Sequence, residues 1–215
     1  MNVEYINKNG YIVETDRAVY VFDYVEGRLP AAYLRNGKPL LFFVSNNGVH
    51  HYSESIYNYR KTVVLSYDVD VTPYSRVFKM KSNEMIHLGF AKVYSFSDLN
   101  EGISYAIVED DVRVFFGGRL NMNENDSPYQ NELYFDLVHK INKYAPYTIA
   151  ILEVNINDGM RYMEGAQYFI NHCKPRHLFP LNFGELDEFN ESIRNRELKF
   201  YMPKFSNHKF EVENV

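Results

Sequence analysis

The chain has 215 residues, of which 46% are hydrophobic and 24% charged, a composition typical of a globular protein that can bury a substantial core. Its formal net charge of −5 provides no basic field to gather nucleic acid or an anionic membrane, so neither partner is expected. Cys173 is the single cysteine, which excludes an intrachain disulfide and favours a reducing, cytoplasmic setting. No apolar run is long enough for a signal peptide or a membrane span, and we expect one soluble domain over 1–215.

The first half of the sequence is typical of short strands. Segments rich in β-branched and aromatic residues alternate with Asn, Gly, Asp or Pro, which punctuate hairpins and meanders. Ser53 can cap a short helix that runs through Arg60, and Glu109-Asp110-Asp111 has the composition of a hairpin turn. The expected strands are 10–14, 18–24, 40–45, 62–66 and several pieces between 77 and 116.

The second half changes to a helical period. Ser127 followed by Pro128 marks a helix start, and apolar residues then recur at helical spacing from Tyr134 to Tyr144. Strands first and alternating helices and strands later predict an α+β or layered α/β domain. The further expected elements are a strand over 148–154, a helix over 160–173 with Cys173 in the core, a strand over 176–181, a helix over 185–196 and a frayed tail over 206–215.

Three short motifs give the chain a resemblance to a known family. Val44-Ser45 ends a buried strand before a loop, Phe116-Gly117-Gly118 ends a later strand, and Phe179-Pro180-Leu181 ends another. In this order the motifs resemble the small, single-domain branch of the metallo-β-lactamase-fold hydrolases, over nearly the whole chain. The resemblance implies an αββα four-layer sandwich with two zinc half-sites on loops at one edge.

The residues at the family's metal-binding positions differ from the family pattern. A His-x-His-x-Asp-His run should follow Val44-Ser45, but this chain has Asn46, Gly48 and His50 at the first three ligand positions, and His51 is the only one retained.

Three further positions complete the comparison with the family. Arg119 stands at the position of the metal-bridging Asp, and Asn182 stands at the position of the final His. Asp23 matches a family Asp that supports the loops. The site residues implied by the resemblance are therefore Asp23, Asn46, Gly48, His50, His51, Arg119 and Asn182.

These substitutions give a poor zinc site. A catalytic zinc needs about three imidazole, thiolate or carboxylate ligands and an open water position, whereas Asn46 offers a neutral amide and Gly48 no side chain. The guanidinium of Arg119, placed about 4 Å from a divalent ion at an effective dielectric of about 20, would cost on the order of 8 kcal/mol. We therefore expect no zinc cofactor. We also hypothesise that Arg119 takes the place of the metal as a donor to Asn46, Asn182 or a carboxylate.

Three interpretations of function remain open at this stage. The first is a pseudoenzyme that binds a small anionic ligand or a protein partner at the former active-site mouth, with Arg119, His50 and His51 as ligand-binding residues. The second is a divergent hydrolase with one metal held by His50, His51 and either Asp23 or Asp98. The third is a structural or assembly subunit, possible as an oligomer, because aromatic residues make up 16% of the chain and are enriched at interface cores.

Other candidate residues are interpreted as structural. The adjacent His50 and His51 should point in divergent directions, and the acidic segment Ser95–Gly102 is typical of a turn. No His-Glu-x-x-His, Gly-x-Ser-x-Gly or phosphate-binding glycine pattern occurs. The scattered histidines, which we interpret as surface or packing residues, are His139, His172, His177 and His208.

Overall fold

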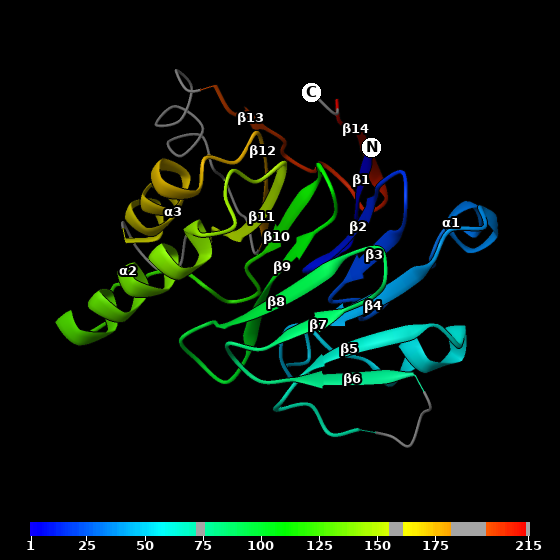
Figure 1. Cartoon of the computed structure of the whole chain (residues 1–215), viewed down its shortest axis with the longest axis horizontal. Coiled ribbons are helices and arrows are strands. Elements are labelled where there is room, and N and C mark those ends of the chain that lie inside the picture. Colours follow the sequence, from blue (N-terminus) through cyan, green and yellow to red (C-terminus); the bar gives the residue numbers. More distant parts are fainter. Residues whose placement is uncertain (72–75, 155–160, 182–196, 214–215) are drawn as a thin grey trace. The chain divides into compact units, whose positions relative to one another are not determined.

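The structure is a computed structural model that describes residues 1–71, 76–154, 161–181 and 197–213. Its chain forms two compact units, Met1–Lys81 with Pro203–Val215 and Ser82–Met202, and each is described by itself. Figure 1 labels the elements of both units. No helix in the described part of the chain is long and apolar enough to cross a membrane. The expected single domain over 1–215 stays a prediction.

The first unit holds a seven-stranded sheet in the order β14-β1-β2-β3-β4-β5-β6. The pairs from β14 to β3 are antiparallel, and those from β3 to β6 are parallel. Every residue of β3 and β4 is buried, as expected for strands covered on both faces. The strands are β1 (Asn2–Asn7), β2 (Gly10–Glu14), β3 (Val19–Phe22), β4 (Leu40–Val44), β5 (Thr62–Ser66), β6 (Val77–Met80) and β14 (His208–Glu211).

One of the two short helical segments of this unit was predicted from the sequence, and the other was not. The expected helix is a 3-10 turn, η1 (Glu54–Tyr59), in which the Ser53 side chain accepts a hydrogen bond from the Ser55 amide at 3.3 Å. Arg60 ends it in a left-handed conformation. No pattern in the sequence predicts α1 (Ala31–Arg35), because a helix of five residues is too short to show a helical period.

The prediction that 206–215 frays is wrong for the described part of that segment. Strand β14 pairs with β1 through four residues, and the Asn207 side chain donates to the Glu4 carboxylate at 3.0 Å. Val212 is buried. The main chain of β1 forms hydrogen bonds with this polar segment and orders it, although its composition alone predicts fraying.

The second unit holds another seven-stranded sheet, in the order β13-β12-β11-β10-β9-β8-β7. Strands β7 to β10 are antiparallel, whereas β10 to β13 are parallel. The predicted turn at Asp110 is confirmed, since the Glu109 amide donates to the Val112 carbonyl at 2.9 Å between β9 and β10. The strands are β7 (Met85–His87), β8 (Lys92–Ser97), β9 (Ile103–Val108), β10 (Arg113–Phe116), β11 (Ile149–Glu153), β12 (His177–Leu181) and β13 (Lys199–Phe200).

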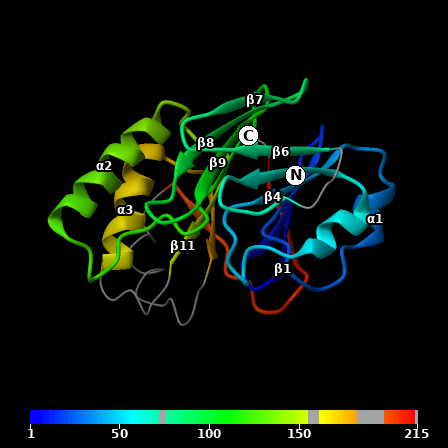
Figure 2. The ribbon, with the colours of Figure 1, turned by 90° about the horizontal axis from the view of Figure 1, so that it is seen from below.

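Two helices of this unit, α2 (Pro128–Asn142) and α3 (Arg161–Cys173), lie side by side in both views (Figures 1 and 2). The predicted start of α2 is confirmed, because Ser127 and Gln130 form a capping box that satisfies two free amides of its first turn. Burial raises the pKa of the Cys173 thiol to about 12, which fits the expected core side chain. The expected helix over 185–196 lies outside the described residues.

Candidate functional site

The parallel strands β3 and β4 of the first unit end at the same edge of their sheet. Asp23 follows β3 directly, and Ser45 follows β4. The Asp23 amide donates to the Phe43 carbonyl at 2.8 Å, which extends the parallel ladder by one residue. Open sheets with parallel strands place functional groups at the carboxyl ends of those strands, so this edge is a candidate functional site.

The Asp23 carboxylate is the centre of a fully buried polar cluster. Its Oδ1 accepts the Ser45 amide at 2.8 Å, and its Oδ2 accepts the Ser45 hydroxyl at 2.7 Å. The same Oδ2 lies 2.6 Å from His51 Nδ1. Asp23 has a φ of 42°, a left-handed conformation that Asp tolerates better than most residues. Asp23, Ser45, His51 and the neighbouring Asn9 are called the Asp23 cluster below.

His51 is buried, and both its ring nitrogens are engaged. Nδ1 faces the Asp23 carboxylate, which can only accept, so Nδ1 carries a proton. Nε2 lies 3.3 Å from the Asn9 side-chain nitrogen, in the turn between β1 and β2. The Asn9 amide therefore occupies the lone pair of His51 that a metal would need.

The loop after β4 uses its own amide groups to close a turn. The Asn46 Oδ1 atom accepts the Gly48 amide at 2.8 Å, and its Nδ2 atom donates to the Ser45 hydroxyl at 3.2 Å. A Cβ at Gly48 would lie 2.7 Å from Asn46 Oδ1, so a larger residue at this position would displace the Asn46 side chain. His50 is exposed while His51 is buried, and the two imidazoles thus lie in different surroundings.

The described groups at this edge provide few of the strong donors that belong to the zinc centre that the resemblance implies. Zinc requires about three strong donors, but Asn46 and Asp23 are committed to hydrogen bonds within the loop and cluster, and Gly48 has no donor. In 1–71, 76–154, 161–181 and 197–213, no group of three or more His, Cys, Asp or Glu side chains could hold a metal ion. Asp98, the alternative acid considered for a single-metal site, follows β8 and accepts the amides of Asn100 and Gly102 within a turn.

The second unit has its own set of polar groups where strands β10 and β11 end. Gly117 and Gly118 turn the chain after β10, with the Gly117 amide donating to the Ile151 carbonyl at 2.8 Å and Gly118 at a φ of 59°. This turn leaves Arg119 exposed, and its guanidinium makes no hydrogen bond or ion pair with any described residue of this unit. Its expected role as a donor to Asn46 or Asn182 stays a prediction, and Asn182 lies outside the described residues. The carboxylate that we also considered as a partner is not found among the described residues of this unit.

Arg119 lines a polar cavity of about 200 Å³. Glu153, the last residue of β11, is a buried member of the lining. The Asn121 side chain supports this wall by donating to the Glu153 carbonyl at 2.8 Å. The lining consists of Leu99, Asn100, Arg119, Asn121, Met122, Asn123, Asp126, Gln130 and Glu153.

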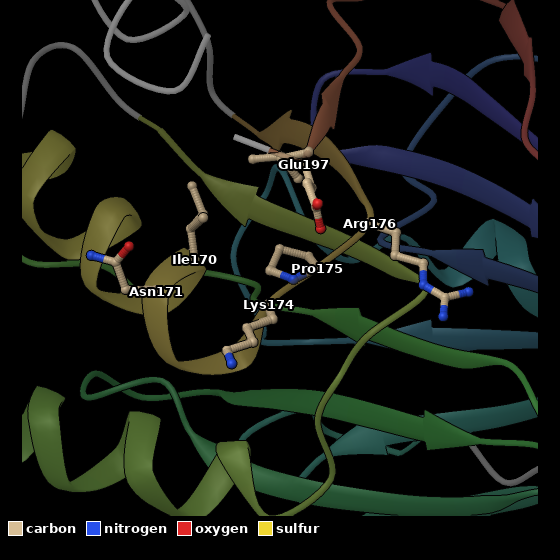
Figure 3. Close-up of a pocket in the computed structure, with 7 residues that line it drawn as sticks. Ile170, Asn171, Lys174, Pro175, Arg176 and Glu197 are labelled. Atoms are coloured by element: carbon tan, nitrogen blue, oxygen red, sulfur yellow. The ribbon is translucent and has the colours of Figure 1, made fainter. Parts of the chain in front are cut away.

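A larger cavity of about 430 Å³ lies at the opposite edge of the second unit's sheet, where α3 connects to β12 (Figure 3). Its polar lining residues, Asn171, Lys174, Arg176 and Glu197, are exposed, and Lys174 and Arg176 are directed away from each other. The C-terminal end of α3 carries a partial negative charge, which disfavours the binding of an anion there. This cavity therefore lacks the converging charges of a binding site.

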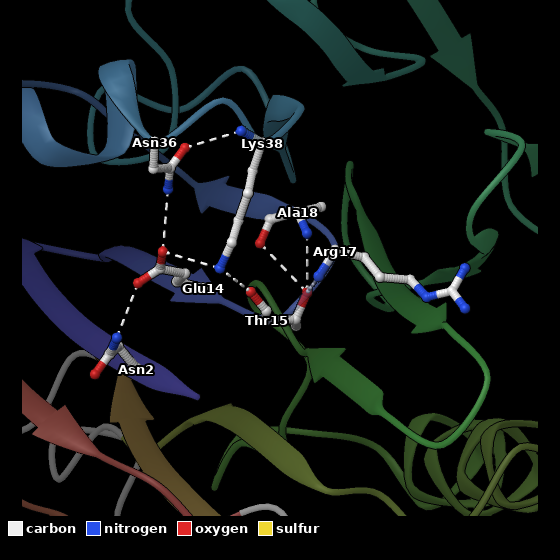
Figure 4. A network of polar contacts seen from close by, with 7 residues as sticks. All are labelled: Asn2, Glu14, Thr15, Arg17, Ala18, Asn36 and Lys38. Carbon is white, nitrogen blue, oxygen red and sulfur yellow. Dashed lines mark hydrogen bonds and ion pairs between the residues drawn. The ribbon is translucent and has the colours of Figure 1, made fainter.

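Figure 4 shows another polar network of the first unit, around Glu14. Glu14 pairs with Val19 at the start of β3, whereas Asp23 follows the end of that strand. Glu14 accepts Asn2 Nδ2 at 2.8 Å, Asn36 Nδ2 at 3.0 Å and Lys38 Nζ at 3.1 Å. Burial raises the pKa of the Glu14 carboxyl, but these hydrogen bonds and the Lys38 charge outweigh it, and the net pKa is lowered. The network joins β1, β2 and the start of β4, which is a structural role.

The structure thus divides the residues that the sequence singled out. It brings Asp23, Asn46, Gly48 and His51 together in the first unit, and it places Arg119 at the corresponding strand ends of the second. The sequence reasoning missed Ser45, Asn9 and Glu153. Ser45 and Glu153 had a usable signal, since each is a polar residue at the end of an apolar strand, whereas Asn9 in its turn had none.

Comparison with solved structures identifies the fold. The sequence matches no protein-family model and no curated protein. CmlA, a diiron β-hydroxylase from Streptomyces venezuelae, has a TM-score of 0.71 at 12% identity over 98% of this chain, which spans only 54% of the CmlA chain. A metallo hydrolase from Ignicoccus hospitalis has a TM-score of 0.65 at 12% identity, covering 99% of this chain and 100% of its own.

A third solved structure agrees with these two. The metallo-β-lactamase-fold protein YhfI from Bacillus subtilis has a TM-score of 0.64 at 13% identity, covering 98% of this chain and 99% of its own. The chain therefore has the metallo-β-lactamase fold, and the layered α+β class expected from the sequence is confirmed.

Proposed function

We propose that this chain is a binding protein on the metallo-β-lactamase fold, which works without the dinuclear zinc centre and takes a small anionic ligand at Arg119. The observation that carries the proposal is the exposed guanidinium of Arg119, which has no partner among the described residues of its unit and lines a polar cavity at the ends of parallel strands. A guanidinium is always charged and presents a planar set of donors that matches carboxylate or phosphate.

The size and lining of the cavity limit the ligand. At about 200 Å³ it is smaller than the pockets of about 300–1,000 Å³ that hold drug-sized molecules, so inorganic phosphate or a short carboxylic acid fits best. Asn100, Asn121 and Gln130 can supply neutral donors beside Arg119. Because Asp126 and Glu153 also line the cavity, an acid that carries a hydroxyl or amino group is favoured over a plain anion.

The absence of zinc chemistry is the second half of the proposal. His51 is held in place by Asp23 and Asn9, and Asn46 closes its own loop, so both are committed to hydrogen bonds within the protein. The proteins with a similar fold include a metallo hydrolase, and a hydrolase with a rearranged metal centre is the alternative that must be tested. Metal analysis by mass spectrometry, on protein purified without chelator or affinity-tag histidines, separates the two. Near-stoichiometric zinc, manganese or iron that falls in His51→Ala would establish the alternative.

Ligand binding is tested with Arg119→Gln. Phosphate, short hydroxy acids and amino acids are titrated while the melting temperature and the heat of binding are measured. A charge-assisted hydrogen bond contributes about 1.5–3 kcal/mol, so Arg119→Gln should lose about 10- to 100-fold in affinity. Arg28→Gln removes another exposed arginine and should bind as the wild type does. Equal loss in both variants, or no stabilisation of the wild type by any probe, would refute an anion site at Arg119.

A further inference from the structure

Two histidines face each other across the seam between α2 and α3 of the second unit. His139 lies near the end of α2 and His172 near the end of α3, and Figures 1 and 2 show the two helices side by side. The centres of their rings are 5.3 Å apart, and the ring planes meet at 87°. His139 is exposed and His172 is half-buried, so solvent reaches the pair.

Tyr168 fixes the orientation of both imidazoles. Its main-chain carbonyl accepts a hydrogen bond from His172 Nδ1 at 2.8 Å, and its hydroxyl lies 3.1 Å from His139 Nε2. With Nδ1 of His172 protonated, Nε2 keeps its lone pair; if the Tyr168 hydroxyl accepts from Nε2 of His139, the lone pair of that ring is on Nδ1. Metal-binding histidines use this arrangement, in which the second ring nitrogen donates to a carbonyl or another oxygen.

Aromatic packing around Tyr168 restrains the His172 ring before any ligand binds. The Tyr168 ring lies 4.0 Å from the His172 ring and 4.4 Å from the Phe135 ring, measured between centres. Side chains held by such contacts lose little freedom on binding, which favours a preformed site.

The separation of the rings matches a shared metal ion. Two imidazoles that bind one ion at metal–nitrogen distances of about 2.0–2.1 Å have ring centres about 5 Å apart. We propose that His139 and His172 form a two-histidine site for a divalent transition metal that clamps α2 to α3, with water completing the coordination. Copper(II) should bind most tightly, followed by nickel(II) and zinc(II), because imidazole sites follow this order of affinity.

This site shares no residue with the Asp23 cluster or the Arg119 cavity, and it does not depend on the proposed function. It has two protein ligands, in agreement with the lack of any group of three or more His, Cys, Asp or Glu suited to a metal in the described part of the chain. A metal held by two helices binds only the folded state, so it should raise the melting temperature with metal concentration.

The test uses the full chain, first freed of metal with a chelator and then titrated with copper(II), nickel(II) or zinc(II). Thermal unfolding and calorimetry follow binding, and electron paramagnetic resonance of the copper(II) form detects coordinated nitrogen. His139→Gln and His172→Gln should each lose at least tenfold in copper(II) affinity and most of the thermal stabilisation. Tyr168→Phe, which removes only the hydroxyl partner of His139, should weaken binding less.

His87→Gln is the matched control, because His87 is an exposed histidine of the same unit that lies on β7. It should bind copper(II) as the wild type does. Unchanged affinity in both His139→Gln and His172→Gln, or the absence of nitrogen coordination in the copper(II) spectrum, would overturn the proposal. A greater loss of copper(II) affinity in His87→Gln than in His139→Gln and His172→Gln would also overturn the proposal.

Discussion

The replacement of Asp23 by alanine tests whether the Asp23 cluster holds the first unit together. Alanine removes a fully buried carboxylate that accepts the Ser45 amide, the Ser45 hydroxyl and His51 Nδ1. The side chains of His51 and Asp23 are 8% and 0% exposed, so solvent does not screen their interaction. The Ser45 amide would then be buried without its acceptor, and His51 Nδ1 would lose its 2.6 Å contact and keep its 3.2 Å contact with the Ser45 hydroxyl.

The expected loss follows from these contacts. Removal of one partner from a buried ion pair or charged hydrogen-bond network costs about 3–5 kcal/mol. The φ of 42° at this position adds about 1 kcal/mol for alanine, which tolerates the left-handed region poorly. We expect the free energy of unfolding to fall by about 4–6 kcal/mol, against the total of about 5–15 kcal/mol that is usual for a domain.

The assay is equilibrium unfolding in urea, followed by far-ultraviolet circular dichroism and by tyrosine fluorescence, since the chain has 19 Tyr and no Trp. Asp23→Asn keeps the side-chain shape and tolerates the left-handed conformation, so it should fold and lose about half as much. Asp70→Ala is the control, because Asp70 is an exposed aspartate of the same unit and should change stability by less than about 0.5 kcal/mol. A loss below about 1 kcal/mol in Asp23→Ala would show that the cluster does not stabilise the fold.

Three further predictions concern other parts of the chain. The pKa of the Glu14 carboxyl is lowered in the folded state, so its contribution to stability is present above its ordinary pKa of 4.5 and is lost as the pH falls below that value. Lys38→Met removes one cause of the lowered pKa and should therefore reduce the drop in the urea midpoint on acidification. An unchanged drop would contradict this prediction. Cys173, whose pKa burial raises to about 12, should resist a thiol reagent at pH 8 in native protein and react fully in urea, whereas rapid native labelling would show an exposed thiol. Gly165→Ala should lower the free energy of unfolding in urea by about 1–3 kcal/mol, although alanine has the better helix propensity. The reason is that the added methyl group collides with the Asn121 side chain. A gain in stability would show that the Asn121 side chain can move away.

The sequence determined which segments become strands and helices wherever the local pattern was strong. Strands β3 and β4 could be predicted because each is buried on both faces and is therefore an apolar run. The start of α2 at Ser127–Pro128 could be predicted because a helix end needs local partners for its amides. The resemblance drawn from three short strand-end motifs correctly identified the metallo-β-lactamase fold.

The tertiary structure alone decided how the candidate residues are used. Asn9 reaches His51 over 42 positions and Ser45 reaches Asp23 over 22, and no local pattern encodes such pairings. The strand β14 and the seam between His139 and His172 likewise depend on segments far apart in the sequence. Residue types limit the chemistry that a chain can perform, but distance and direction between side chains arise only when the sheet and helices have brought them together.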